Sequence, residues 1–244
     1  MENHTRSREA AQSSARPELL RVDRVSRAFV TPAETVHAVR EVSFAARAGE
    51  FVCIFGPSGS GKTTLLNLIA GLDVPDSGTI HVAGVDVGAL DEAGRARLRL
   101  ETVGVVFQDH QLIEEFTAWE NVALPLEVRG VPLEQARAAA LAELERVGLG
   151  GLTDRLPSQL SGGQRQRVGI ARALAGQRRV LLADEPTGSL DSANSRALFA
   201  LIRALCEQGT LAVVCSHDPL CQEYADTVYE MVDGRLSRRE VARV

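Results

Sequence analysis

The sequence predicts an α/β fold: a core with a mostly parallel sheet, an N-terminal antiparallel β subdomain and an inserted α-helical subdomain. Three observations predict this. Short apolar runs without alternation are typical of parallel strands that are covered on both faces. Helical patterns lie between these runs, and the segment before the first run alternates apolar and polar residues instead. The apolar runs are FVCIF (51–55), VGVVF (103–107), VLLA (180–183) and LAVVC (211–215).

Two helices between these runs have recognisable ends. The helical pattern over residues 62–70 stops before Gly71, a residue type that favours the left-handed position after a helix. The pattern over 192–207 ends before Gly209, and its apolar stripe consists of Leu198, Leu201, Ile202 and Leu205. Strands that alternate with helices imply crossover connections and a parallel core.

The beginning and the middle of the chain differ from this pattern. Residues 20–49 are half-polar and alternating, as expected of an antiparallel sheet beside the core. Between Gln108 and Leu160 the strand signal vanishes and helix formers dominate, especially over 132–149. We therefore expect a disordered tail over 1–19, one domain over 20–237 with a helical subdomain at about 109–165, and a C-terminal tail over 238–244.

Composition excludes several classes of protein. The chain has 244 residues, a hydrophobic fraction of 45% and a formal net charge of −5, and it carries no basic run that could follow a phosphate backbone. We therefore expect no nucleic-acid partner. No apolar stretch approaches the length of about 18 residues that predicts a membrane span, and the N-terminus lacks a secretory signal. The four cysteines form no CxxC pair, and Cys53 and Cys215 lie inside apolar runs, where we expect buried free thiols, consistent with a reducing cytoplasm.

GPSGSGKT (56–63) fits the pattern G-x-x-x-x-G-K-[ST], and it follows a strand and opens a helix as that motif requires. The backbone N–H groups of such a loop and the helix N-terminus favour a phosphate anion. Lys62 is the only lysine in the chain, and its compact ammonium suits the β and γ phosphates better than a planar guanidinium would. The hydroxyl of Thr63 suits Mg²⁺. The motif predicts a nucleotide site and a phosphate-loop NTPase core.

Two further motifs carry chemistry. The strand VLLADEP ends in two carboxylates, of which Asp184 is suited to hold Mg²⁺ and Glu185 to polarise an attacking water. In LSGGQ, Ser161 and Gln164 fit a capping box at a helix start. A capping box does not need the two glycines between its ends, which would let an anion approach the backbone closely.

Together these motifs resemble the nucleotide-binding subunit of an ABC transporter, over roughly residues 20–237. GPSGSGKTT matches the family's phosphate loop, LSGGQRQRV its signature, and LLADEPTGSLD its magnesium aspartate, catalytic glutamate and D-loop. His217 in SHD matches the switch histidine, and Gln108 the Q-loop glutamine. The sequence is most similar to the lipoprotein-release, macrolide-exporter and cell-division branch (LolD-, MacB- and FtsE-like). That branch works with FtsX-like or MacB-like transmembrane permease subunits.

The resemblance implies ATP and Mg²⁺ as cofactors and a head-to-tail dimer that sandwiches ATP between the phosphate loop of one copy and the signature of the other. It implies Glu185, His217, Lys62 and Gln108 as catalytic residues and Thr63, Gln108 and Asp184 as metal ligands. It implies ATP contacts from Phe29, Gly56, Pro57, Ser58, Gly59, Ser60, Gly61, Lys62, Thr63 and Thr64, and from Ser161, Gly162, Gly163, Gln164 and Asp191.

Several of these residues also have a structural interpretation. The resemblance implies that Phe29 stacks on adenine, and the alternative is a phenylalanine of the hydrophobic core. His217 is either the γ-phosphate sensor or a core histidine. Asp191 signals across the dimer and is also a credible N-cap for the helix over 192–207.

The function of the chain also has alternative interpretations. The helical subdomain is the expected contact with a membrane subunit, through Leu112, Ile113, Phe116 and Trp119, or these residues pack its own core. The leading hypothesis is an ATPase subunit that energises a transporter from the cytoplasmic face of the membrane. The alternative is a regulatory ATPase that acts through an FtsX-like partner on a cell-wall hydrolase without transport. A soluble DNA-repair or translation ATPase is weaker, since the chain has neither a long coiled-coil insertion nor a second cassette.

Overall fold

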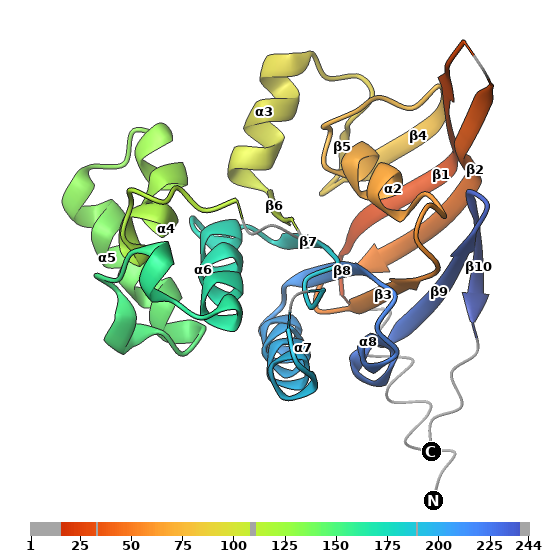
Figure 1. The fold of residues 1–244 in the computed structure, drawn as a ribbon. Coiled ribbons are helices and arrows are strands. Elements are labelled where there is room, and N and C mark those ends of the chain that lie inside the picture. The colour runs from red at the N-terminus through yellow and green to blue at the C-terminus, as the bar shows by residue number, and fades with distance from the viewer. Residues whose placement is uncertain (1–15, 33, 108–110, 189, 240–244) are drawn as a thin grey trace, which may run out of the picture.

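Two sheets and a helical lobe make up the structure, a computed structural model that describes residues 16–32, 34–107, 111–188 and 190–239 (Figure 1). The larger sheet has the order β10-β9-β3-β8-β7-β6, in which all neighbours are parallel except the antiparallel pair β9 and β10. This confirms the predicted core. Its strands are β3 (Phe51–Phe55), β6 (Val103–Val106), β7 (Val180–Asp184), β8 (Leu211–Ser216), β9 (Thr227–Val232) and β10 (Arg235–Arg239).

Helices cover both faces of this sheet, which explains why its strands are apolar without alternation. In β3, Phe51 and Cys53 point into one hydrophobic cluster, whereas Val52 and Ile54 point into another. The first cluster includes apolar residues of α6 (Gly162–Leu174), α7 (Ser192–Glu207) and α8 (Leu220–Tyr224). The second includes residues of α2 (Lys62–Ile69) and α3 (Glu92–Glu101). The helix over 192–207 has the predicted bounds, and α2 ends before Gly71, whose φ is +65°.

The antiparallel sheet has the order β2-β1-β4-β5 and lies beside α2 (Figure 1). Leu20, Val22 and Val39 are buried in the same cluster as the apolar side of α2, so this sheet and the core share one hydrophobic interior. β1 begins at Glu18, two residues before the predicted start of the domain, and the analysis of the sequence missed β4 and β5. The strands are β1 (Glu18–Val30), β2 (Thr35–Arg47), β4 (Ser77–Val82) and β5 (Val85–Asp86).

The predicted helical subdomain is present as a lobe at the far side of the sheet from β10 (Figure 1). It contains α4 (Ala118–Val128), α5 (Leu133–Arg146), two short 3₁₀ helices (Gly150–Leu152 and Pro157–Gln159) and the start of α6. α6 runs beyond the predicted boundary and packs against β6. A side chain at Gly104 in β6 would collide with the carbonyl of Ala173 in α6, so glycine is required for this contact.

The expectations for the cysteines and for the end of the domain can be compared with the structure. Cys53 and Cys215 are buried free thiols, as predicted, and Cys206 and Cys221 are buried free thiols as well. β10 extends to Arg239, two residues past the predicted end of the domain. Within the described ranges, no helix has the length and apolar character needed to cross a membrane.

Candidate functional site

The site is built where three neighbouring strands end. β3, β8 and β7 are adjacent and parallel, with Phe55 opposite Ser216 and Cys215 opposite Asp184. The segments that follow their carboxyl ends therefore meet at one edge of the sheet, where ligands bind in open α/β folds. The phosphate loop follows β3, His217 follows β8, and Glu185 follows Asp184 at the end of β7.

Glycines make the phosphate loop possible. Gly61 has a φ of +105° at the N-cap of α2, and Gly59 has a φ of +80°. A side chain at Gly61 would also collide with the carbonyl of Ala38 in β2, and one at Gly56 with the carbonyl of Met231 in β9. The loop is therefore wedged between strands of both sheets, and the first turn of α2 begins directly at its end.

Lys62 lies inside this loop, with only 6% of its surface exposed. Its Nζ donates to the carbonyl oxygens of Gly56 at 2.8 Å and Pro57 at 3.0 Å. The same nitrogen lies 3.5 Å from Oε1 of Glu185. A buried ammonium with these partners is a fixed positive charge at the centre of the site.

Thr63 and Asp184 meet beside it. The hydroxyl of Thr63 donates to Oδ2 of Asp184 at 2.7 Å. The other oxygen, Oδ1, is buried and has no hydrogen-bond partner within the described chain. Burial raises the pKa of Asp184, while the hydrogen bond from Thr63 opposes that rise. An unsatisfied carboxylate oxygen next to a hydroxyl fits a hard cation such as Mg²⁺, which needs further oxygens from phosphates and water.

Glu185 and His217 form the next pair. Nδ1 of His217 lies 2.9 Å from Oε2 of Glu185, and the backbone N–H of His217 donates to the same oxygen at 3.2 Å. Glu185 has a φ of +46°, a left-handed conformation that is uncommon for glutamate, and its own N–H donates to the carbonyl of Cys215. The side chain of His217 is 67% exposed, which excludes the interpretation as a core histidine.

A cavity of about 1460 Å³ joins these groups to the antiparallel sheet. Lys62, Thr63, Asp184, Glu185 and His217 line it at one end, together with Ser58, Gly59, Gly61 and Thr64 of the loop. Phe29 in β1 lines it as well and is 41% exposed, so this phenylalanine is not a core residue. The cavity is larger than the 300–1,000 Å³ of typical small-molecule sites, which leaves ample room for a nucleotide.

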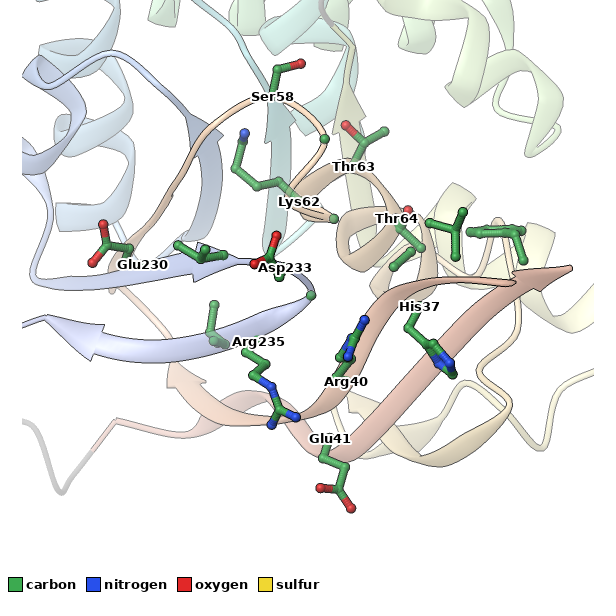
Figure 2. A pocket seen from close by; sticks show the side chains of 18 of the residues that line it. His37, Arg40, Glu41, Ser58, Lys62, Thr63, Thr64, Glu230, Asp233 and Arg235 are labelled. Atoms are coloured by element: carbon green, nitrogen blue, oxygen red, sulfur yellow. The ribbon is translucent and has the colours of Figure 1, made fainter. Parts of the chain in front are cut away.

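The opposite wall was missed by the sequence analysis. Figure 2 shows His37 and Arg40 from β2, and Glu230, Asp233 and Arg235 from β9, β10 and the turn between them, across the cavity from the phosphate loop. No motif contains these residues. They are brought together by the approach of β2 to β9 and β10, which a pattern within one segment does not reveal.

Some predicted ATP-contact residues do not line the cavity. Gly56 and Ser60 are buried in the loop, whereas Pro57 is exposed. The carbonyls of Gly56 and Pro57 accept from Lys62, and the carbonyl of Ser60 accepts from the N–H of Gly234. Gln108 lies outside the described residues. The signature residues 161–164 and Asp191 are also not among the described residues that line the cavity.

The signature begins α6 as a capping box. Oγ of Ser161 accepts from the N–H of Gln164, whose side chain accepts from the N–H of Ser161 in return. The stripe Val168, Ala171 and Leu174 is buried, as the helical interpretation expected. Ser161 itself is exposed, so the start of α6 is open to a ligand or a partner.

Asp191 is the N-cap of α7. Its Oδ1 accepts from the N–H of Asn194 at 2.8 Å, and its Oδ2 accepts from the Asn194 amide at 2.9 Å. A side chain at Gly163 would come within 3.3 Å of Oδ1 of Asn194. The capping interpretation of Asp191 is therefore confirmed, and the cap lies against the signature of the same chain.

The four residues predicted to contact a membrane subunit lie just before α4 and in its first turn. Leu112 and Trp119 pack against the core cluster, and the Trp119 ring also contacts the guanidinium of Arg137 at 5.2 Å, so for these two residues the packing interpretation is confirmed. Ile113 and Phe116 are half-buried. Buried Asn121 fixes the segment, because its amide accepts from the N–H of Ile113 and donates to the carbonyls of Ile113 and Phe116.

Known sequences show which family the chain resembles. The family model described as "ABC transporter" matches residues 39–188. The chain is 44% identical to the lipoprotein-releasing system ATP-binding protein LolD 2 of Caulobacter vibrioides, over 89% of this chain and 96% of that protein. It is also 44% identical to LolD of Shewanella denitrificans, over 92% and 97%. The macrolide export ATP-binding/permease protein MacB of Salmonella typhi is 44% identical over 89% of this chain, which spans only 34% of MacB.

Solved structures agree with the sequence comparison. The dimeric, post-hydrolysis structure of the ATP-binding cassette MJ0796 bound to ADP and Pi has a TM-score of 0.84 and 36% identity, covering 93% of this chain and all of that one. The structure of cbiO1 from Clostridium perfringens, part of the ABC transporter complex cbiONQ, has a TM-score of 0.81 and 28% identity, over 90% and 87%. The predicted fold class is therefore confirmed. The chain belongs to the ABC transporter family, as one of its ATPase cassettes.

Proposed function

We propose that two copies of this chain bind two Mg²⁺-ATP molecules between them and that hydrolysis drives a conformational change in a partner membrane protein. One observation carries the proposal. Lys62, Thr63, Asp184, Glu185 and His217, which come from three separate segments, meet at one end of a cavity that has Phe29 on its wall.

Within one chain, the phosphate loop and Lys62 would hold the β and γ phosphates of ATP. Lys62 now donates to two carbonyl oxygens, and a phosphate oxygen is a stronger acceptor for the same ammonium. The exposed ring of Phe29 would stack on the adenine base. These contacts orient the nucleotide and fix the position of its terminal phosphate.

Thr63 and Asp184 would hold the Mg²⁺ ion, with Gln108 as a further ligand outside the described residues. The ion supplies positive charge to the phosphate oxygens as negative charge shifts during transfer. Among the described residues Oδ1 of Asp184 has no hydrogen-bond partner, which supports this role, because such a buried carboxylate oxygen carries a desolvation penalty that a cation or its water shell removes.

Glu185 would orient and polarise the attacking water. Lys62 and His217 both contact its carboxylate, and these contacts set the direction of the carboxylate before a nucleotide arrives. His217 lies at the open side of the cavity and would sense the γ-phosphate. Catalysis then depends on positioning and charge rather than on covalent chemistry by the protein.

The proposed dimer would give a role to signature residues that the nucleotide cavity of their own chain does not use. At the start of α6, Ser161 is exposed and Gly162 to Gln164 are half-buried, yet none of them is among the described residues that line the cavity of their own chain. A head-to-tail arrangement would bring them to the γ-phosphate held by the second copy. Helix N-termini favour such an anion. Asp191 would reach the second copy from the same side, since its cap lies against Gly163.

The partner is proposed from the relatives. LolD belongs by name to a lipoprotein-releasing system, and MacB by name combines an ATP-binding part with a permease for macrolide export. Both names describe transport, which favours an exporter or extrusion system over the regulatory alternative. We propose an FtsX-like or MacB-like permease at the cytoplasmic face of the membrane, contacted through the lobe near Ile113 and Phe116.

The test starts with the purified chain. We expect Mg²⁺-dependent ATP hydrolysis, a loss of about a hundredfold or more in Glu185→Gln, and ATP-dependent dimers of that variant in light scattering. Glu207→Gln, an exposed change at the end of α7, is the control and should hydrolyse ATP normally. Undiminished hydrolysis in Glu185→Gln would refute its assignment. A co-purifying permease would support the partner, and a co-purifying cell-wall hydrolase would favour the regulatory alternative.

A further inference from the structure

Phe29 is held from one side by an arginine. The guanidinium carbon of Arg27 lies 4.9 Å from the centroid of the Phe29 ring, within the range of a cation–π contact. Arg27 is not among the described residues that line the cavity, whereas Phe29 is. One face of the ring is therefore taken by the guanidinium, and the ring remains accessible from the cavity.

Two aspartates fix this guanidinium. Asp73 accepts from Nε and Nη2 of Arg27 at 2.9 and 3.0 Å, and Asp76 accepts from Nη1 at 2.7 Å. A planar guanidinium with its fork satisfied on two carboxylates is held in one orientation. Both Arg27 and Asp73 are about three-quarters buried, so this ion pair is better protected from solvent than a surface pair.

The same aspartates connect Phe29 to the phosphate loop. Oδ2 of Asp76 accepts from the N–H of Ala28 at 2.7 Å, which fixes the backbone next to Phe29. The N–H of Asp73 donates to the carbonyl of Asn67 in α2, the helix that begins at Lys62. The strand that carries the aromatic ring and the helix that carries the phosphate loop are thus joined through one cluster, Arg27–Asp73–Asp76.

We propose that Arg27 is a positioning residue of the nucleotide site: it orients the Phe29 ring for the purine base and sets the distance between the base and the phosphates. Phenylalanine has no hydroxyl, so its ring cannot be oriented by a hydrogen bond of its own. The cation on the far face restricts the ring and makes a stacked purine more favourable. The proposal rests on the ATP site described above and adds a residue to it.

The experiment compares a ligand that has a base with one that lacks it. We expect Arg27→Ala to raise the Kd for Mg²⁺-ATP about three- to tenfold and to leave the Kd for inorganic tripolyphosphate within about twofold. KM for ATP should rise by the same factor while kcat stays unchanged. Arg27→Lys keeps the cation but loses the fork, and should recover part of the ATP affinity.

Two controls separate positioning from folding. Arg24→Ala removes an arginine from the same strand that is 79% exposed and should change neither Kd. In a Phe29→Ala background, Arg27→Ala should have no further effect on ATP, because a residue that acts through the ring cannot act without it.

Three results would overturn the inference: unchanged ATP affinity in Arg27→Ala, an equal loss for ATP and tripolyphosphate, or additive effects of the two alanine variants. If the wild-type chain itself bound no ATP, the proposed function would fail first. The two failures are therefore distinguishable.

Discussion

His217 contacts one oxygen of Glu185 twice, through Nδ1 at 2.9 Å and through its backbone N–H at 3.2 Å. The two residues follow neighbouring strands, β8 and β7, and are 32 positions apart in the chain. The position of the loop after β8 is thus coupled directly to the direction of the Glu185 carboxylate. A shift of that loop by a fraction of an ångström would move the carboxylate relative to an attacking water.

We expect His217→Ala to lower kcat for ATP hydrolysis about a hundredfold while changing the Kd for ATP less than threefold. Alanine removes the Nδ1 contact and keeps the backbone N–H, so Glu185 loses part of its orientation while the phosphate loop stays intact. Phosphate release and equilibrium binding check this. His81→Ala, in β4 of the antiparallel sheet, is the matched control. A normal kcat in His217→Ala would contradict the role.

Lys62→Arg tests whether charge alone is sufficient. The ammonium occupies a buried position between two carbonyl oxygens and a carboxylate, which a planar guanidinium cannot fill. We expect the Kd for ATP to rise about ten- to a hundredfold in Lys62→Arg, nearly as much as in Lys62→Ala. The control Arg24→Lys, on an exposed side chain, should have no effect. Full affinity in Lys62→Arg would show that the position requires only a positive charge.

Much of the fold was predictable, because its central strands are buried on both faces. Continuous apolar runs gave β3, β6, β7 and β8 within one residue of their ends. β10 is an edge strand of the sheet and β9 is its neighbour, and both are mostly half-buried or exposed, so their apolar signal is weak. β5 contains only two residues, too few for any periodicity.

The parts of the site that are formed by residues close together in the sequence were predictable. The phosphate loop and the two carboxylates after β7 are local motifs, and strand order brings them together. The cavity wall formed by Arg40, Glu230 and Arg235 comes from a contact between two sheets, which no local pattern encodes. Arg27 was missed for the same reason, since its partners lie 46 and 49 residues away.

Gly61 and Gly59 provide a test of the loop's backbone. Both have positive φ, but a side chain at Gly61 would collide with the carbonyl of Ala38, whereas no atom of the described residues lies within 4 Å of one at Gly59. We expect Gly59→Ala to lower the free energy of unfolding by about 1 kcal/mol and Gly61→Ala by about 2 to 4 kcal/mol. Urea unfolding at equilibrium measures both. Equal losses would mean that the loop relaxes away from β2 freely.

We expect the ionised carboxylate of Asp184 to lower the stability of the fold while ATP hydrolysis requires it. Burial raises the pKa of its carboxyl above the ordinary 3.8, so the folded protein holds this proton more tightly than the unfolded chain does. Its contribution to stability is therefore fully present below pH 3.8 and is lost as the pH rises through the higher folded value. Asparagine does not ionise and can still accept from Thr63. The free energy of unfolding of Asp184→Asn should therefore rise relative to wild type as the pH increases from 4 to 7, as measured by urea unfolding at each pH.

The same variant should lose Mg²⁺-dependent hydrolysis by about a hundredfold or more, because a neutral amide holds the cation and its water far less strongly than a carboxylate. Asp23→Asn is the matched control: its side chain is 54% exposed, so its stability should stay within about 0.5 kcal/mol of wild type and its turnover should be normal. If the stability difference between Asp184→Asn and wild type were independent of pH, the carboxyl would titrate alike in the folded and unfolded chain. If the stability rose but hydrolysis persisted, the metal would be held without Asp184, and Thr63 with Gln108 would have to carry that role.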